Sequence, residues 1–348
     1  MKKLLFIGPI NKGNTPYTGD SAKNQFFEKR FREVFSKVSL VDTWAWKRRP
    51  WVLIELLFKL AFCRNYKIVV SANAGSADKI IKLAKIFGHT PRIFYWVIGG
   101  SLPEMLKKRI FDWRTYSNIG GIFVEGTKMV ESMQGLGLTN VRCVPNFKDI
   151  CYVSQKDKCI DSKLHFVFIS RIVKAKGCDY ILEAVEKLNA KGLSDKFDVT
   201  FFGKTTENQE WLDSFTNKVN LINNVVFKGL LDLRQPKNYG VLSRYDVMLF
   251  PTYWGGEGFP GVIIDAYMSG LPVIATDWNL NTDLIIEGKT GWIIPVHDVD
   301  ALVDKMEYVM NSQSEVKQFS LNCSVQALEY DFRNVLSEDN LKALKVLD

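Results

Sequence analysis

The sequence predicts an α/β protein made of two Rossmann-like domains, each with a parallel β-sheet. Short apolar segments alternate with longer segments of helical periodicity, which is typical of βαβ units. This alternation occurs twice, and a polar, charge-rich segment at 148–163, KDICYVSQKDKCIDSK, separates the two occurrences. The length of 348 residues also suits two domains, since one domain typically takes roughly 150 residues.

The apolar segments give the expected strands in chain order. In the first half they lie at 3–7, 38–41, 67–71, 93–97, 121–124 and 142–144. In the second half they lie at 164–169, 199–202, 225–227, 247–250, 273–275 and 292–294. Helical patterns occupy the segments between them. Ligands of such sheets bind beyond the carboxyl ends of the strands, so the residues that follow each strand are the candidates for chemistry.

We expect three parts along the chain. Residues 1–155 form an N-terminal domain that faces an acceptor and a membrane, and residues 156–325 form a C-terminal donor domain. Residues 326–348 form a helical segment that packs back on the N-terminal domain.

The charge is unevenly distributed between the two halves. Residues 1–150 contain 25 Lys and Arg against 11 Asp and Glu, a net +14, whereas the remainder has 21 against 27, a net −6. Within the basic half, the segment TWAWKRRPWVLIELLFKLAFCR at 43–64 combines three tryptophans, three consecutive cations and an apolar helical run. This combination favours contact with an anionic membrane surface. The alternative is an ordinary core helix with a solvated basic edge. No nucleic-acid-binding module is recognisable, so no nucleic-acid partner is expected.

The apolar runs are too short and too interrupted by charge to cross a bilayer, and the first strand follows Lys2 and Lys3 without a signal-peptide pattern. The expected location is the cytoplasm, at the inner face of the plasma membrane. The six cysteines show neither C-x-x-C pairs nor zinc-finger spacing, so we expect reduced, structural thiols.

A phosphate site is predicted after the first strand of the second half. Arg171 and Lys176 lie in the loop that joins this strand to a long amphipathic helix. The N–H groups of a helix start and two cations favour a diphosphate, because Arg grips two oxygens and Lys supplies a point charge. The alternative is that both side chains are solvated surface residues.

Two carboxylates flank a second predicted helix start. Glu257 lies in the glycine-rich loop TYWGGEGFPGV, and a helix is expected to begin near Phe259 or Pro260. Asp265 then falls one to two turns into that helix. Carboxylates accept paired hydrogen bonds from adjacent hydroxyls, so two acids on either side of a phosphate site suit a nucleotide sugar. The alternative is that Glu257 only caps the helix and Asp265 is exposed.

These motifs resemble those of the retaining GT-B glycosyltransferases of the glycogen synthase-like group, family four. SRIVKAKG resembles the family's G-R-x-x-x-x-K-G, and EGFPGVIIDA resembles its E-x(7)-E. The segments FKG, YDVMLFPT, SGLPVIATD and EGKTGWIIP follow in the family's order, and VEGTKMVESM and VPNF of the first half are similar to the segment before the family's interdomain linker. The resemblance implies two Rossmann-like domains whose sheets face each other across a cleft.

The resemblance also implies a reaction: transfer of a sugar from a UDP- or GDP-linked donor to an acceptor with retention of configuration, without metal or other cofactor. It implies that Arg171 and Lys176 neutralise the leaving diphosphate, that Glu257 contacts the donor sugar and that Asp265 holds the ribose. Further donor-binding residues are expected at Ser170, Lys228, Gly229, Gly256, Gly258, Phe259, Pro260 and Gly261.

Three positions depart from the family pattern. Asp265 replaces the usual glutamate, and Ser170 replaces the glycine before the motif arginine. Many members have a histidine near the donor sugar in the first domain, but His89 precedes the relevant strand instead of following it. We therefore consider the residues after that strand, and one near the N-terminus, as candidates for the sugar or acceptor side: Gly99, Gly100, Ser101 and Gly19.

The leading hypothesis is a glycosyltransferase that extends a saccharide acceptor in the biosynthesis of capsule, O-antigen or lipopolysaccharide. We expect this acceptor to be linked to lipid. The missing first-domain histidine keeps a non-catalytic nucleotide-sugar-binding subunit as an alternative, and another GT-B enzyme such as an epimerase or a phosphorylase is the third.

Overall fold

A computed structural model describes residues 2–13, 19–154, 163–256 and 258–347. The chain divides into two compact units. The first comprises Met1–Asp149 together with Tyr330–Asp348, and the second comprises Ile150–Glu329. Each unit has its own parallel sheet and its own core.

The first unit contains a six-stranded parallel sheet in the order β2-β1-β3-β4-β5-β6. Its strands are β1 (Lys3–Gly8), β2 (Lys37–Asp42), β3 (Lys67–Asn73), β4 (Ile93–Ile98), β5 (Gly121–Val124) and β6 (Val141–Cys143). The strands predicted for the first half are thereby confirmed.

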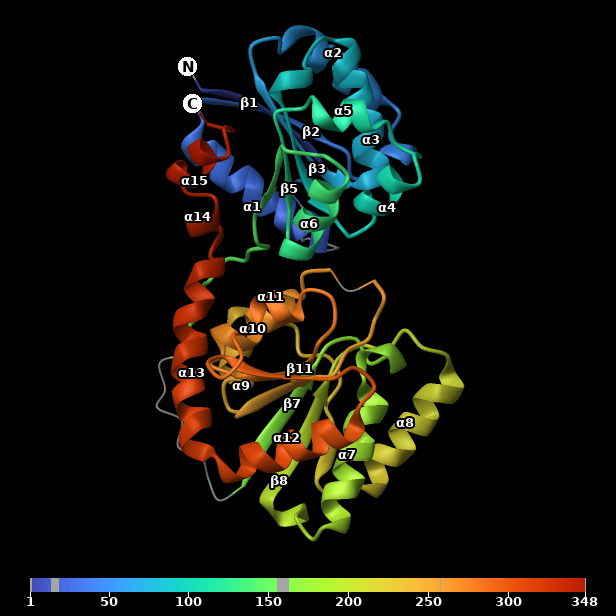
Figure 1. The fold of residues 1–348 in the computed structure, drawn as a ribbon, viewed down its shortest axis with the longest axis vertical. Coiled ribbons are helices and arrows are strands. Elements are labelled where there is room, and N and C mark those ends of the chain that lie inside the picture. Colours follow the sequence, from blue (N-terminus) through green and yellow to red (C-terminus); the bar gives the residue numbers. More distant parts are fainter. Residues whose placement is uncertain (1, 14–18, 155–162, 257, 348) are drawn as a thin grey trace. The chain divides into compact units, whose positions relative to one another are not determined.

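Helices cover both faces of this sheet. One face packs against α2 (Trp51–Phe62), α3 (Ala74–Ile86), α4 (Leu102–Lys107), α5 (Trp113–Ser117) and α6 (Thr127–Gly135). The other packs against α1 (Gly19–Val34), α14 (Phe332–Val335) and α15 (Glu338–Ala343), and Figure 1 shows the two groups on opposite sides of the strands. Strand residues alternate between the two cores: Leu5 and Ile7 of β1 face the first group of helices, and Leu4 and Phe6 face the second. Burial on both sides explains why the strands read as continuous apolar runs.

The C-terminal segment is tied to the first unit through the backbone. Lys148 N donates to Tyr330 O (3.0 Å), and Phe332 N donates to Lys148 O (2.9 Å). Arg333 adds an ion pair with Asp149 at 2.5 Å. The two chain passages between the units therefore lie beside each other at this point of the first unit.

The second unit contains another six-stranded parallel sheet, in the order β12-β11-β10-β7-β8-β9. Its strands are β7 (Leu164–Ile169), β8 (Phe197–Phe202), β9 (Val225–Phe227), β10 (Val247–Phe250), β11 (Val273–Thr276) and β12 (Gly291–Ile294). They confirm the strands predicted for the second half, and each of the two units is Rossmann-like.

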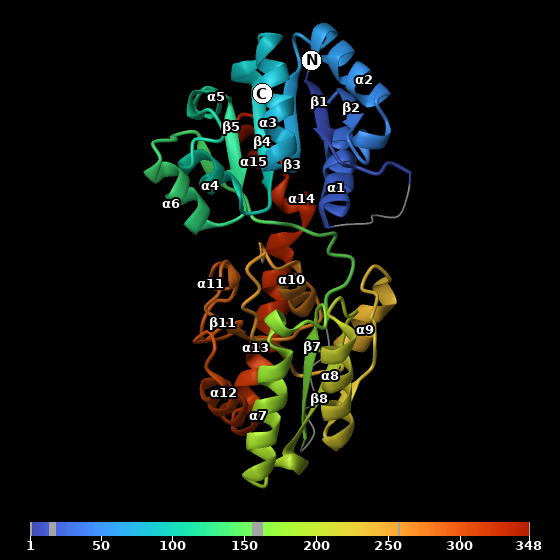
Figure 2. The same cartoon turned by 90° about the vertical axis from the view of Figure 1, so that its right-hand side faces the viewer.

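Helices α7 (Cys178–Ala190), α8 (Gln209–Leu221) and α12 (Val299–Asn311) bury their apolar sides on one face of the second sheet. Figure 2 shows α7 and α8 beside β7 and β8. The other helices of this unit are α9 (Tyr239–Leu242), α10 (Gly261–Met268), α11 (Asn281–Leu284) and α13 (Gln313–Ala327), and α10 packs against α13. Because all strands are parallel, the loops that follow β7, β8, β9 and β10 meet at one edge.

Candidate functional site

The carboxyl edge of the second sheet is held together by loop-to-loop hydrogen bonds. Ser170 N, after β7, donates to Phe202 O at 3.2 Å, and Gly203 N, after β8, donates to Gly229 O at 2.8 Å. A Cβ at position 203 would lie 1.8 Å from Ser170 O, so only glycine permits this approach. Ser170 and Gly229, both predicted from the sequence, thus lie in one connected edge.

Lys176 is positioned by a tight turn at the start of α7. It ends the short 3₁₀ turn η3 (Lys174–Lys176), and Gly177 follows with φ of 80°. A Cβ on Gly177 would lie 2.2 Å from Pro251 O, just beyond β10. Tyr253 N donates to Ala175 O at 2.8 Å, which joins the same two loops. The glycine after the motif lysine therefore has a structural reason: it lets the start of α7 contact the end of β10.

The two predicted cations both lie against the end of β10. Lys176 is buried, and its Nζ lies 5.1 Å from the centre of the Phe250 ring. Arg171 is exposed, and its guanidinium lies 4.7 Å from the Trp254 ring, where cation–π attraction favours it. The structure thus brings the two cations to one strand end. Charges at such a partly buried edge interact with an anion more strongly than they would in bulk water.

Asp265 is a buried carboxylate with a tyrosine partner. Only 5% of its surface is exposed, and Oδ1 accepts a hydrogen bond of 2.7 Å from Tyr239 Oη of α9. Burial, followed by the charge of Asp265, raises the pKa of Tyr239, so this phenol remains a donor at neutral pH. The alternative that Asp265 is exposed is wrong.

The helix that carries Asp265 begins slightly later than predicted. α10 begins at Gly261, and Pro260 is its N-cap in an extended conformation instead of its first helical residue. Phe259 is buried and Gly258 is half-buried. A Cβ on Gly256 would lie 2.7 Å from Trp254 Nε1, so this glycine allows the indole to pass close to the backbone. Glu257 lies outside the described residues, and its role stays a prediction.

Lys228 and Gly229, both expected to bind the donor, follow β9. The main chain belongs to the carboxyl edge, since Lys228 N donates to Phe201 O at 3.0 Å. Lys228 is also one of the residues that line a groove of about 450 Å³, together with Lys163, His165 and Asp198 from the beginnings of β7 and β8.

The candidates of the first unit lie at the carboxyl edge of its own sheet. Gly99, with φ of 81°, and Gly100 follow β4 and are exposed, and Ser101 is the N-cap residue of α4. Gly19 is the first residue of α1. His89 lies before β4 and is fully buried, with Nε2 2.7 Å from Leu60 O, so it has a structural position.

A charged cluster that the sequence did not indicate lies at the carboxyl edge of the first sheet. The buried Lys23 of α1 forms an ion pair with Glu125, which follows β5, at 2.5 Å. Asp20 lies in the first turn of α1, where burial and, next, the Glu125 carboxylate raise its pKa. The signal available in the sequence was a lysine four residues after a candidate glycine, and it did not indicate the partner 102 positions away.

No group of three or more His, Cys, Asp or Glu side chains that could hold a metal ion occurs among the described residues. Asp298 is the N-cap of α12, and Oδ1 accepts from Ala301 N at 2.9 Å.

Residues 154–323, the greater part of the second unit, match the protein family described as "Glycosyl transferases group 1". Two curated proteins are similar over much of this region. The capsular polysaccharide biosynthesis glycosyltransferase CapM of Staphylococcus aureus is 27% identical over 157 residues, which cover 45% of this chain and 39% of CapM. The putative colanic acid biosynthesis glycosyltransferase WcaL of Salmonella typhimurium is 25% identical over 147 residues, which cover 41% and 35% of the two chains. The matches thus span well under half the length of either relative.

Among solved structures, HepE of Anabaena in complex with UDP is similar over 99% of both chains, with a TM-score of 0.74 and 14% sequence identity. A likeness at this identity concerns the fold. Two Rossmann-like units with six-stranded parallel sheets, a family match over residues 154–323 and this structural relative together identify the chain's fold as that of the GT-B glycosyltransferases.

Proposed function

We propose that the protein is a glycosyltransferase that moves a sugar from a nucleoside-diphosphate sugar to a saccharide acceptor. The observation that carries this proposal is the position of Lys176 against Phe250, which ends β10, and of Arg171 against Trp254 in the loop that follows, with both cations inside the segment that matches the glycosyltransferase family. The UDP in the structure of HepE, and the capsule and colanic acid pathways named for CapM and WcaL, support a nucleotide-sugar donor and a role in polysaccharide biosynthesis.

The chemistry follows from where charge develops. As the bond between the anomeric carbon and the diphosphate breaks, negative charge grows on the leaving phosphate oxygens, while the acceptor hydroxyl forms the new bond to that carbon. Arg171 offers a planar set of donors and Lys176 a compact ammonium, and both lie against aromatic neighbours. Preorganised charges of this kind stabilise the transition state more than the ground state.

Asp265 and the α10 N-terminus complete the donor site in this proposal. The Asp265 carboxylate would accept hydrogen bonds from ribose hydroxyls, and Tyr239 would hold that carboxylate in position. The N–H groups at the start of α10, next to Pro260, would face a phosphate. Glu257 would contact the donor sugar.

The motif resemblance supports three further features of the reaction. These are retention of anomeric configuration, activity without a metal ion or other cofactor, and an acceptor linked to lipid. The two cations would then have the role that a divalent cation has in metal-dependent transferases.

A non-catalytic nucleotide-sugar-binding subunit is the second candidate. It is favoured by the burial of His89 and by the presence of Gly99 and Gly100 after β4, in the part of the first unit where the motif resemblance implies a histidine in many family members. Such a subunit would bind a donor without transferring its sugar.

The two candidates are separated by turnover measurements on purified protein with a panel of UDP- and GDP-sugars, with and without saccharide acceptors. Release of UDP or GDP that depends on Arg171 supports the transferase. Arg171→Ala should remove about 2–4 kcal/mol of transition-state stabilisation and so lower the turnover rate. Arg234→Ala, at an exposed position of the same unit, should leave the turnover rate unchanged. Tight donor binding without turnover on any acceptor would favour the binding subunit, and near-normal turnover of Arg171→Ala would contradict the assigned role.

A further inference from the structure

Helix α2 of the first unit has apolar side chains on both its buried and its exposed sides. Val52, Leu56 and Leu60 face the core. The opposite side is exposed to solvent: the exposed fraction is 59% for Trp51, 70% for Ile54, 62% for Phe58 and 71% for Phe62. A helix with apolar side chains on all sides is normally covered by other protein or by a membrane.

The charged residues of α2 lie at the border of this exposed side. Glu55 and Lys59 form an ion pair with each other. The Lys59 ammonium also donates to the carbonyl of Leu40 in β2. Glu55 and Lys59 are therefore engaged with each other and, through Lys59, with β2. The exposed row of Trp51, Ile54, Phe58 and Phe62 itself contains no charged residue.

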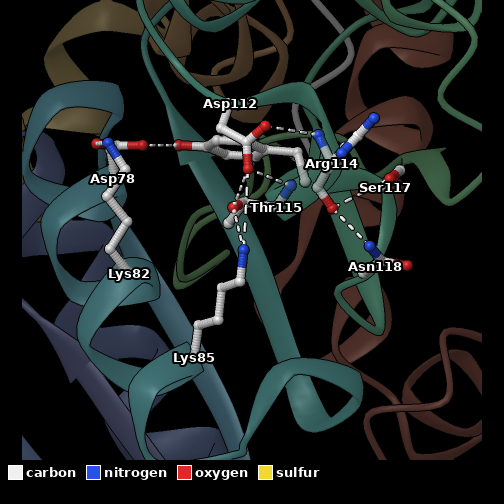
Figure 3. A network of polar contacts seen from close by, with 9 residues as sticks. Asp78, Lys82, Lys85, Asp112, Arg114, Thr115, Ser117 and Asn118 are labelled. Carbon is white, nitrogen blue, oxygen red and sulfur yellow. Dashed lines mark hydrogen bonds and ion pairs between the residues drawn. The ribbon is translucent and has the colours of Figure 1, made fainter.

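Apolar exposure continues onto the neighbouring helices. His89, shortly after the end of α3, contacts the Leu60 carbonyl of α2, and Ile86 at the end of α3 is exposed. On the other side of α3, Lys85 donates to Thr115 Oγ1 of α5 at 3.1 Å (Figure 3). Exposed Ile110 and Trp113 precede and begin α5. We call the outer surface formed by α2, the end of α3 and residues 107–114 the α2–α5 face.

Acidic groups on and beside this face are already paired with lysines. Asp78 pairs with Lys82 at 2.7 Å and Glu104 with Lys108 at 2.6 Å. The Asp112 carboxylate lies 3.9 Å from Lys85. Further cations remain, exposed and without an ion pair among the residues that the structure describes: Lys47, Arg48, Arg64, Lys107, Arg109 and Arg114.

We propose that the α2–α5 face binds the surface of an anionic lipid bilayer. Tryptophan and phenylalanine side chains insert at the boundary between headgroups and acyl chains, and surrounding Lys and Arg side chains are attracted to anionic headgroups. The basic rim argues against a second copy of the chain as the occupant, because two such faces would bring like charges together. It also argues against nucleic acid, whose phosphates leave the exposed phenylalanines uncovered.

Binding at this face is interfacial. No helix in the described parts of the chain is long and apolar enough to cross a membrane. The aromatic side chains of α2 would enter the headgroup region and the core of the first unit would stay outside it. This inference does not depend on the proposed sugar transfer, since it rests only on the first unit's surface.

The test is flotation of the full chain with vesicles of phosphatidylcholine alone and of phosphatidylcholine mixed with phosphatidylglycerol. The wild type should float with the anionic vesicles only, and 0.5 M salt should weaken binding, since screening reduces the attraction. Phe58→Ser with Phe62→Ser should lower the partition coefficient by at least about tenfold. Arg48→Gln with Arg64→Gln should lower it by on the order of tenfold, because each cation near such a surface contributes about 1 kcal/mol.

Matched controls come from the second unit. Leu221→Ser with Val325→Ser removes two exposed apolar side chains there, and Lys196→Gln with Lys237→Gln removes two exposed cations. Both control variants should bind anionic vesicles as the wild type does. The inference is overturned if the wild type fails to bind these vesicles, or if the Phe58 and Phe62 variant binds equally well. It is also overturned if sedimentation velocity shows a wild-type dimer that this variant dissociates while neither protein binds vesicles.

Discussion

The hydroxyl of Tyr239 donates a 2.7 Å hydrogen bond to Oδ1 of Asp265, and both side chains are buried. Tyr239 lies in the short helix α9 and Asp265 is the fifth residue of α10, so this bond fixes one helix against the other at the candidate donor site. The bond also sets the orientation of the carboxylate that we propose as the ribose ligand.

Replacing Tyr239 with Phe should therefore weaken nucleotide binding while the fold is kept. Loss of a hydrogen bond to a charged group costs about 1.5–3 kcal/mol, so UDP or GDP affinity should fall by about tenfold or more in isothermal titration calorimetry. As a positioning residue, Tyr239 should change the donor KM more than kcat. Tyr308→Phe is the control, because that exposed tyrosine bonds to Glu315 on the surface of the same unit. Equal affinities of wild type and Tyr239→Phe would contradict the positioning role.

The buried ammonium of Lys176 should be required for turnover. Lys176→Met keeps the apolar stem against Phe250 and removes the charge. The loss of about 2–4 kcal/mol of transition-state stabilisation should lower kcat. Lys174→Met changes an exposed lysine of the same 3₁₀ turn and should leave turnover unchanged. Steady-state kinetics with the donor found to be active provide the measurement. A Lys174→Met defect as large as that of Lys176→Met would indicate a general disturbance of the loop.

Two glycines that flank α7 separate backbone strain from close packing. Gly177 and Gly192 have φ of 80° and 78°, so Ala at either position is strained, typically by about 1–2 kcal/mol. A Cβ at 192 meets no atom within 4 Å, whereas a Cβ at 177 meets Pro251 O. Gly177→Ala should therefore lower the free energy of unfolding more than Gly192→Ala, in urea denaturation, and only Gly177→Ala should weaken UDP or GDP binding. Equal effects on stability and binding would show that the contact with Pro251 is unimportant.

His89 should make stability depend on pH. Its Nε2 lies 2.7 Å from the Leu60 carbonyl, which accepts, so the neutral ring carries its proton on Nε2. Burial lowers the pKa of His89 below its usual 6.5. The unfolded state therefore binds a proton more readily, and the free energy of unfolding should decrease as pH falls below about 6.5.

His89→Gln keeps a side-chain donor for Leu60 and removes this titration. Its free energy of unfolding, measured by denaturation between pH 7 and pH 5, should fall less steeply than that of the wild type. An unchanged slope would show that another group is responsible.

The sequence alone predicted the strands of both sheets, because the central strands are buried on both faces and read as apolar runs between turn residues. It also predicted that Arg171 and Lys176 share one loop, since they are five positions apart after a strand. It could not predict that Tyr239 is the partner of Asp265, because they are 26 positions apart and α9 is only four residues long. The exact start of α10 also differed, because Pro260 caps the helix from an extended conformation.

Exposure was the other property that sequence could not determine. The pattern of α2 is apolar throughout, so periodicity did not distinguish Val52, which is buried, from Phe58 and Phe62, which are exposed. The composition of the segment at 43–64 predicted contact with a membrane surface, which stays a prediction. The contributions of Ile86 and Trp113 depend on which helices share a face of the sheet.

The most direct test of the central claim is a crystal structure of the protein with UDP or GDP. We predict a diphosphate that contacts the guanidinium of Arg171 and the ammonium of Lys176 at the end of β10, with ribose hydroxyls bonded to Asp265. A nucleotide bound elsewhere, or a diphosphate at this edge without contact to either cation, would contradict it.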